Sequence, residues 1–541
     1  MRTAIPMKPL AMAALAATLA FVLIETSHTV KAQKPRNSPA MAMPPRPAAV
    51  AGGFYPADPA ELGKMVDGFL AQAAPPALPD LVALVAPHAG YQYSGPVAAW
   101  SYALLKAQVA KGRKVERVVV IAPSHYEAFG FASVYDGAAY STPLGAVPVD
   151  RAFAARLAKM NSLIKLSGAG HTPSADKPEH ALEDQLPFLQ RVLGDFQLVP
   201  IVVGDQSYDV CRALGLALAK LIQGPETLIV ASSDLSHYHP YNDAVKMDHK
   251  TLKAVEEWDY LNLSRNLELR VWEACGGGPI VATMIAAERL GARQAKVLKY
   301  ANSGDVTADK SRVVGYGAVA LVKAAPGGKT ADAAFSLTAD EKETLLKIAR
   351  TSVETAVKER KQYECPPPES ATLDQERGAF VTLTKKGRLR GCIGYVSPLK
   401  PLYLTVRDVA LYAALKDTRF SPVTPGELGD LEYEISVLSP LRRVLDVQEI
   451  QVGKHGLLIR KGENEGLLLP QVPADEGWDR ATFLEQVCYK AGLDKDAWHN
   501  PDADLFRFTA LVFGGRKRPD QQAGWPLPPA PDSQSPRAAL F

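Results

Sequence analysis

Continuous apolar runs alternate with segments of helical periodicity between residues 51 and 323. The runs have the length and aliphatic content of buried strands, and they cover residues 81–87, 117–124, 196–204, 227–234 and 313–322. Apolar residues recur at helical spacing in the stretches 59–72, 96–110, 150–159, 182–193 and 210–222. Strands that alternate with helices predict an α/β domain over residues 51–323, with a mostly parallel sheet flanked by helices.

A second pattern begins near Ser336, after a small Gly-rich stretch that predicts a linker at 324–335. An acidic first turn there predicts a helix, and alternating apolar residues at 379–394 predict a hairpin with Lys386-Gly387 at its turn. A further helix near 401–416 and a strand at 431–440 are expected. This order indicates a smaller α+β domain over 336–520, followed by a Pro-rich disordered tail at 521–541.

The first 32 residues have the pattern of a targeting segment. Basic residues precede an uncharged stretch at 9–24, which is shorter than a spanning helix but fits the apolar part of a signal peptide. We expect a signal peptide or an uncleaved N-terminal anchor at 1–32 and a Pro-rich spacer at 33–50. The protein would then be exported (periplasmic) or membrane-anchored, with the membrane contacted only through this segment. A misassigned start codon would instead leave it cytoplasmic.

Composition excludes several classes of protein. The 541 residues carry 61 basic and 58 acidic side chains, a balance that argues against a nucleic-acid partner. With 47% hydrophobic residues, the chain has enough apolar material for packed cores and is not globally disordered. Five cysteines are too few for a disulfide scaffold, and their odd number leaves at least one thiol unpaired within the chain.

Side chains that can bind metals gather where the predicted strands of the first domain end. His88 and His125 each follow a buried strand, and His237 follows a third, with Asp234 three residues before it. Ligands of open α/β sheets bind beyond the carboxyl ends of the strands. We therefore expect these side chains at one rim of the sheet.

Cys275 adds a thiol directly before a predicted helix, whose N-terminal dipole favours the thiolate. His180 and Glu183 lie three residues apart near another helix start and are expected to share a face. Imidazole and thiolate together suit iron, zinc or copper better than magnesium. The residues therefore favour a His/His/Cys metal site surrounded by Asp234, His237 and His180.

Other candidates have plainer interpretations. We expect His171, His239 and His249 to be loop or surface histidines, and Cys211 to belong to the core. The run 276–278 is either a phosphate cradle at a helix start or a tight turn, and the turn is favoured because no P-loop Lys-Ser/Thr follows it.

Short motifs in a fixed order cover almost the whole first domain. They read AGGFYP from Ala51, APHAGY from Ala86, APSH from Ala122, EHALEDQLPF from Glu179, SSDLSH from Ser232, ACG from Ala274 and GYGA from Gly315. Residues 48–323 thereby resemble the Memo family, a relative of the class III extradiol dioxygenases. Ala181 stands where the family usually has Ser.

The resemblance implies metal ligands at His88, His125 and Cys275. It also implies that Asp234, His237 and His180 line the same pocket as catalytic side chains. True extradiol dioxygenases use a carboxylate as the third iron ligand, and the cysteine here replaces it.

The second domain carries motifs that resemble the AMMECR family, namely LRGCIG from Leu389, DTRFSP from Asp417, LPQVP from Leu469 and FLEQVCYKAGL from Phe483. Cys392 beside Arg390 is either a reactive thiol or a buried structural cysteine, the latter being favoured. Arg419 either holds an anion or pairs with an acidic neighbour.

The fusion resembles components B and A of the bacterial AmmeMemoRadiSam system in one chain, which implies a radical SAM protein as partner. Three functions remain open. The first is a non-heme iron, dioxygenase-like redox enzyme with Fe(II) as the expected metal and Cu or Zn as alternatives, accompanied by an accessory AMMECR-like domain. The second is a non-catalytic module that binds a small molecule, a peptide or a partner. The third is a metal-handling protein.

Overall fold

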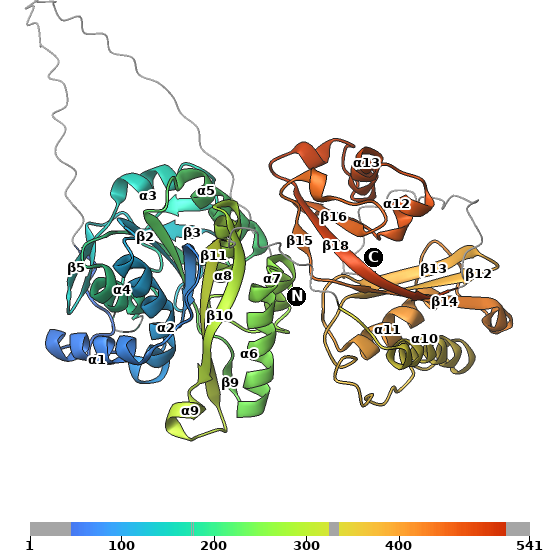
Figure 1. Ribbon diagram of the computed structural model, residues 1–541, viewed down its shortest axis with the longest axis horizontal. Helices are drawn as coiled ribbons and strands as arrows, with labels where there is room; N and C mark the ends of the chain where they lie inside the picture. The colour runs from blue at the N-terminus through green and yellow to red at the C-terminus, as the bar shows by residue number, and fades with distance from the viewer. Residues whose placement is uncertain (1–44, 175, 177, 324–334, 516–541) are drawn as a thin grey trace, which may run out of the picture. The chain divides into compact units, whose positions relative to one another are not determined.

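The computed structural model describes residues 45–174, 176, 178–323 and 335–515 (Figure 1). The expected targeting segment, most of the spacer, the linker up to 334 and the tail lie outside the described residues. Within these ranges no helix combines the length and the apolar content that crossing a membrane requires.

A nine-stranded sheet organises the first domain, with the order β10-β11-β1-β8-β2-β7-β3-β6 and with β9 beside β11. Its four central strands are mutually parallel: β1 (Leu81–Ala86), β8 (Thr227–Ser232), β2 (Arg117–Pro123) and β7 (Gln197–Val203). β11 pairs antiparallel to β1, and β3 pairs antiparallel to β7. The predicted α/β domain with a mostly parallel sheet is therefore confirmed, with antiparallel strands towards its edges.

The outer strands of this domain are short except at one edge. They are β3 (Ala132–Val134), β6 (Ile164–Leu166), β9 (His237–His239), β10 (Ala292–Asn302) and β11 (Val313–Lys323), and a separate hairpin contains β4 (Ala139–Thr142) and β5 (Gly145–Pro148). The helices are α1 (Pro59–Gln72), α2 (Tyr91–Ala110), α3 (Arg151–Leu157), η1 (Glu183–Gln185), α4 (Leu186–Leu193), α5 (Tyr208–Leu221), α6 (Tyr241–Glu256), α7 (Tyr260–Glu268), α8 (Gly277–Arg289) and α9 (Gly304–Thr307).

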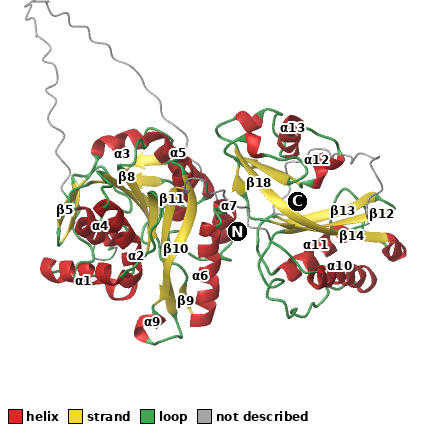
Figure 2. Cartoon of the chain, viewed as in Figure 1, coloured by secondary structure: helices red, strands yellow, loops and turns green. Residues whose placement is uncertain are grey.

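Helices cover both faces of the sheet (Figure 2), which explains the uninterrupted apolar strands. Along β2, Val118 and Val120 belong to one core cluster, whereas Val119 and Ile121 belong to the other. Every residue of β1 and β8 is buried. Because both faces are occupied by packing, polar chemistry is confined to the strand ends.

The folded domain begins earlier than the sequence suggested. Arg46, which falls within the expected spacer, is only 3% exposed. Its guanidinium donates to a Glu183 carboxylate oxygen at 2.5 Å and to the carbonyl oxygens of His171 and Glu179 at 2.6 and 2.5 Å. The Pro-rich composition of residues 33–50 predicted a spacer and gave no sign of the Arg46 contacts, because a single buried ion pair does not change the composition of a segment.

The second domain is built on a seven-stranded antiparallel sheet of order β13-β12-β14-β18-β16-β17, with β15 beside β18. The strands are β12 (Ala379–Lys385), β13 (Arg388–Tyr395), β14 (Leu431–Leu438), β15 (Arg442–Arg443), β16 (His455–Lys461), β17 (Asn464–Leu468) and β18 (Asp504–Gly514). The helices are α10 (Ala339–Glu359), α11 (Leu402–Leu415), η2 (Pro425–Asp430), η3 (Val447–Glu449), α12 (Gln471–Asp475), α13 (Arg480–Lys490) and η4 (Ala497–His499).

The predicted α+β character and the predicted hairpin are confirmed. β12 and β13 pair antiparallel, and the turn between them places Lys386 at φ 53° and Gly387 at φ 75°. A two-residue turn with both φ values positive matches the right-handed twist of the strands that it joins.

Candidate metal centre

Three histidines meet at the carboxyl ends of the central strands. His88 follows β1 and His125 follows β2, and these two strands flank β8 in the sheet. His180 reaches the same point from the turn before η1. Each of the three offers a ring nitrogen, and these atoms all lie within 4.8 Å of one another. Two of the expected strand-end histidines, His88 and His125, therefore meet at this rim, and the third member of the group is His180 instead of His237.

Hydrogen bonds fix the tautomer of His88. The Ser232 hydroxyl donates its single proton to the Ala181 carbonyl oxygen at 2.5 Å, and it accepts from the Gln185 amide at 2.7 Å. The same oxygen lies 2.9 Å from His88 Nδ1. Since the hydroxyl proton is already committed, Nδ1 carries the hydrogen and Nε2 keeps its lone pair. A histidine binds a metal through a ring nitrogen that carries no proton, so this tautomer suits His88 as a ligand through Nε2.

Glu179 performs the same role for His125. One carboxylate oxygen accepts from His125 Nδ1 at 3.0 Å, and the other accepts from the His125 backbone N–H at 2.6 Å. His180 Nδ1 faces the Pro178 carbonyl oxygen at 3.4 Å, a weak contact with the same polarity. All three rings thus direct Nδ1 outward to an acceptor and leave Nε2 as the ligating atom.

Burial favours neutral imidazoles at two of the three positions, His88 and His180. Burial, followed by the neighbouring histidines, lowers the pKa of His88 well below its usual value. Burial and His125 lower the pKa of His180 to about 4. At His125 burial also lowers the pKa, but the hydrogen bond and the charge of Glu179 outweigh it, so the net shift is upward.

Cys275 lies against this group beside His88. Its Sγ is 3.1 Å from His88 Nε2 and accepts from the Asp234 backbone N–H at 3.2 Å. Gly276 makes the approach feasible, because a Cβ there would lie 2.1 Å from the Ser232 carbonyl oxygen. The third member of the histidine group is His180, so Cys275 as a ligand stays a prediction.

The expected thiolate is not favoured at Cys275. Although α8 begins at Gly277, burial raises the pKa of the thiol, and the charge of Asp234 adds to the effect. The N-terminal dipole predicted the opposite direction. Partial withdrawal of the thiol from water and the nearby Asp234 carboxylate both penalise the thiolate.

Asp234 contacts His88, and His237 is near enough to act electrostatically on both residues. The Asp234 carboxylate is 3% exposed and accepts from the His88 backbone N–H at 2.8 Å. Burial raises its pKa to about 6, against the hydrogen bond from His88 and the charge of His237. His237 Nδ1 donates to the Leu235 carbonyl oxygen at 2.9 Å, which leaves its Nε2 without a proton in the neutral ring.

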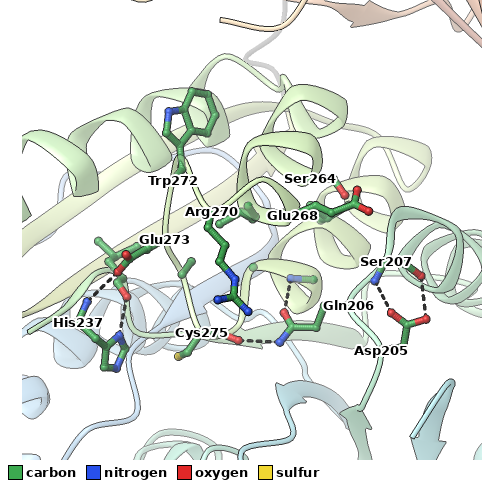
Figure 3. Close-up of a pocket in the computed structure, with 16 residues that line it drawn as sticks. Asp205, Gln206, Ser207, His237, Ser264, Glu268, Arg270, Trp272, Glu273 and Cys275 are labelled. Carbon is green, nitrogen blue, oxygen red and sulfur yellow. Dashed lines mark hydrogen bonds between the residues drawn. The ribbon is translucent and has the colours of Figure 1, made fainter. Parts of the chain in front are cut away.

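A cavity of about 520 Å³ adjoins the centre, and Cys275 and His237 both line it (Figure 3). This volume lies in the range of small-molecule sites. The Gln206 amide bridges its wall, donating to the Cys275 carbonyl oxygen at 2.8 Å and accepting from the Gly278 N–H at 2.7 Å. The N–H groups of 276–278 all have partners within the protein, so the turn interpretation of this run is favoured over a phosphate cradle.

Glu183 has a structural environment. Its two carboxylate oxygens accept from Arg46, from the Tyr55 hydroxyl and from the backbone N–H groups of Ala49 and Val50. This candidate therefore anchors the N-terminal segment of the domain rather than offering a free oxygen.

The remaining histidine predictions have mixed outcomes. His171 lies in a loop but is fully buried, where its Nε2 donates to the Ser133 carbonyl oxygen at 2.9 Å. His239 binds Glu273 at 2.9 Å, and His249 is exposed. Cys211 is buried in the core, as predicted.

The candidates of the second domain are engaged by neighbouring side chains. Arg390 pairs with Glu427 through two contacts of 3.1 Å, and Arg419 pairs with Asp417 at 2.7 and 2.9 Å. Burial raises the pKa of Cys392, whose Sγ lies 3.2 Å from the Thr382 hydroxyl. These contacts favour the structural interpretations of Cys392 and Arg419.

Comparison with known proteins follows the same division of the chain. Residues 46–320, which make up half of the chain, match the family model described as Memo-like protein. The chain belongs to the Memo family. Residues 346–513 match the AMMECR1 family model, so the Memo domain is fused to an AMMECR1 domain.

Several proteins that are similar to parts of this chain come from archaea. A MEMO1 family protein of Methanopyrus kandleri is 38% identical over 285 residues, which is 51% of this chain and 98% of that protein. A MEMO1 family protein of Aeropyrum pernix is 40% identical, over 51% of this chain and 98% of the relative. A solved structure of an uncharacterized protein from Pyrococcus horikoshii is 38% identical, covers 33% of this chain and 94% of its own, and has a TM-score of 0.33.

The sequence missed the residues that orient the Memo histidines. The orienting residues Glu179, Ser232 and Gln185 lie within the family motifs, but none of them was predicted as a site residue. A signal did exist for Glu179, which directly precedes His180. Ser232 and Gln185 become recognisable only when the fold brings them to His88.

Proposed function

We propose that the Memo domain is a metal-dependent redox enzyme whose metal, iron(II), is held by His88, His125 and a third ligand, either His180 or Cys275. The observation that supports it best is the set of three imidazoles with Nδ1 hydrogen-bonded outward and ring nitrogens within 4.8 Å of one another. Imidazole and thiol donors fit iron, copper or zinc, and three protein ligands leave coordination positions open for reactants.

The protein's own residues would prepare the reaction around that metal. A bound iron or copper ion would supply Lewis acidity and one-electron chemistry. His237 has its Nδ1–H committed to Leu235, so its Nε2 can accept a proton at the wall of the cavity. Asp234 holds the His88 backbone in place and is a second group that can take up a proton.

Metal analysis of the full chain tests the proposal. Protein purified both aerobically and anaerobically should contain a stoichiometric amount of a transition metal, and His88→Ala should lose it. His180→Ala and Cys275→Ala identify the third ligand by which of them abolishes retention. His249→Ala is the matched control, because this histidine is exposed on α6. If neither the aerobic nor the anaerobic preparation retains a transition metal, the proposal is refuted.

A metal-handling role is the second candidate, and the exposure of the site favours it. His125 is exposed and His180 is partly exposed, so one side of the group faces solvent. A carrier should release its metal to a competing chelator within seconds to minutes, whereas a resident catalytic metal should exchange far more slowly. The exchange rate of the loaded protein separates the two functions.

A further inference from the structure

The cavity beside the metal centre contains a cationic side chain with no partner. Arg270 lines the cavity, and in Figure 3 its guanidinium extends into the central space between Cys275 and Gln206. Across the described residues, its guanidinium has no hydrogen bond or ion pair. Because Arg270 is exposed, its guanidinium is open to solvent at the cavity and available to a ligand.

The backbone at Arg270 provides an independent observation. The residue has φ 55°, and it follows α7 where its N–H donates to Leu267 and the Val271 N–H donates to Asn266. These two bonds form a Schellman motif, in which the left-handed position is usually glycine because a Cβ is unfavourable there. Retention of a large side chain at such a position is the kind of local strain that marks functional sites.

The surrounding charges restrict the ligand to one negative charge. Three acidic side chains line the cavity together with Arg270: Asp205, Glu268 and Glu273. Asp205 accepts from Ser207, and Glu273 accepts from His237 and His239, whereas Glu268 points away from the guanidinium in Figure 3. A carboxylate matches one guanidinium in the bidentate geometry, whereas each further negative charge on a ligand would be opposed by the acidic side chains of the wall.

The aliphatic residues of the cavity wall favour an acid whose remaining part is apolar. Leu235, Leu267 and Val281 contribute aliphatic wall, and Cys275 and His237 lie on the side that adjoins the histidine group. We propose that the Memo domain binds an organic monocarboxylic acid, with its carboxylate on Arg270 and its other end at Cys275 and His237. This inference rests on the proposed function only where it regards the acid as the substrate of the metal centre.

Binding of a matched pair of probes tests the inference in the full chain. The probes are 3-phenylpropanoate and its neutral amide, 3-phenylpropanamide, followed by ligand-observed NMR titration at millimolar concentration. The wild type should bind the acid about tenfold more tightly than the amide, which is the scale of a hydrogen bond to a charged group. Arg270→Gln should abolish this preference, Arg270→Lys should retain part of it, and the exposed Arg151→Gln should leave it unchanged.

Two further features keep the test decisive. Arg270→Gly suits the left-handed backbone and so should fold at least as well as wild type while losing the preference. Titrations of protein with and without bound metal separate this inference from the proposed function, because a chain that binds no metal can still discriminate acid from amide. Equal affinity for the two probes, no binding of the acid, or an unchanged preference in both Arg270→Gln and Arg270→Gly would overturn the inference.

Discussion

Glu179→Gln is expected to weaken metal binding by the Memo domain without unfolding it. The Glu179 carboxylate is 4% exposed and accepts four N–H groups: His125 N at 2.6 Å, His125 Nδ1 at 3.0 Å, His180 N at 3.0 Å and Ala181 N at 3.1 Å. Three of these reach one oxygen, and the His125 backbone N–H reaches the other. Glutamine has a single acceptor oxygen and cannot satisfy both positions.

Either orientation of the amide disturbs His125. If the amide oxygen takes the three-donor position, the NH₂ group faces the His125 backbone N–H. If the orientation is reversed, the NH₂ group faces His125 Nδ1, which can accept only when the ring proton moves to Nε2, the expected ligand atom. Loss of such an orienting carboxylate typically lowers metal affinity 10- to 100-fold, or about 1.4–2.7 kcal/mol.

The assay is a competition titration of Zn²⁺ against a chromophoric chelator, since zinc avoids oxidation during the measurement. Glu127→Gln is the matched control, because Glu127 lies in the same loop as His125 and, among the described residues, its carboxylate accepts only from the Gly170 N–H at 2.8 Å. Thermal unfolding of each variant shows whether the fold is intact. Unchanged zinc affinity in a folded Glu179→Gln protein would mean that His125 is not a ligand, and the orientation argument would fail.

Three further predictions concern stability, each measured by denaturant unfolding of the full chain. Arg46→Met should destabilise by about 3–5 kcal/mol, because it leaves the buried Glu183 carboxylate without its cation, and the added change Glu183→Gln should recover part of the loss; additive effects would contradict this coupling. Burial lowers the pKa of His171 to about 3, so protons bind the unfolded state preferentially and stability should fall by about 2 kcal/mol between pH 7 and pH 5. His171→Gln should flatten that fall, and an unaltered pH profile would assign it to other groups. Arg270→Gly should stabilise by about 1 kcal/mol through relief of the left-handed backbone, whereas a destabilised variant would show that the arginine contributes packing.

The sequence predicted the strands that carry the site because their apolar runs are uninterrupted. The runs at 81–87, 117–124 and 227–234 became β1, β2 and β8, each differing by only one or two residues at an end. What the runs could not predict is their order in space. β8 lies between β1 and β2 in the sheet, although it follows both of them in the sequence. This order brings Ser232 and Asp234 to His88.

The sequence did not predict several other features, because they depend on local detail or on burial rather than on an apolar pattern. β10 (Ala292–Asn302) lies at the sheet edge with most of its positions exposed or partly buried, and its sequence, interrupted by Lys and Arg, gave no apolar run. α2 begins at Tyr91 rather than near Pro96, which the sequence placed in the first turn because proline is common there. The raised pKa of Cys275 depends on burial, a quantity that spacing does not carry.

The residues around the centre divide by chemistry into an orienting side and an open side. Ser232, Gln185 and Glu179 contact the Nδ1 atoms or their partners, and all three are buried, so they can hold the rings but cannot meet a substrate. Cys275 and His237 instead line the cavity that Arg270 enters. Cys275 belongs to both environments, since its Sγ lies 3.1 Å from His88 Nε2 and the residue is part of the cavity lining. We therefore predict that changes at Cys275 alter both metal retention and binding of the acid proposed for Arg270.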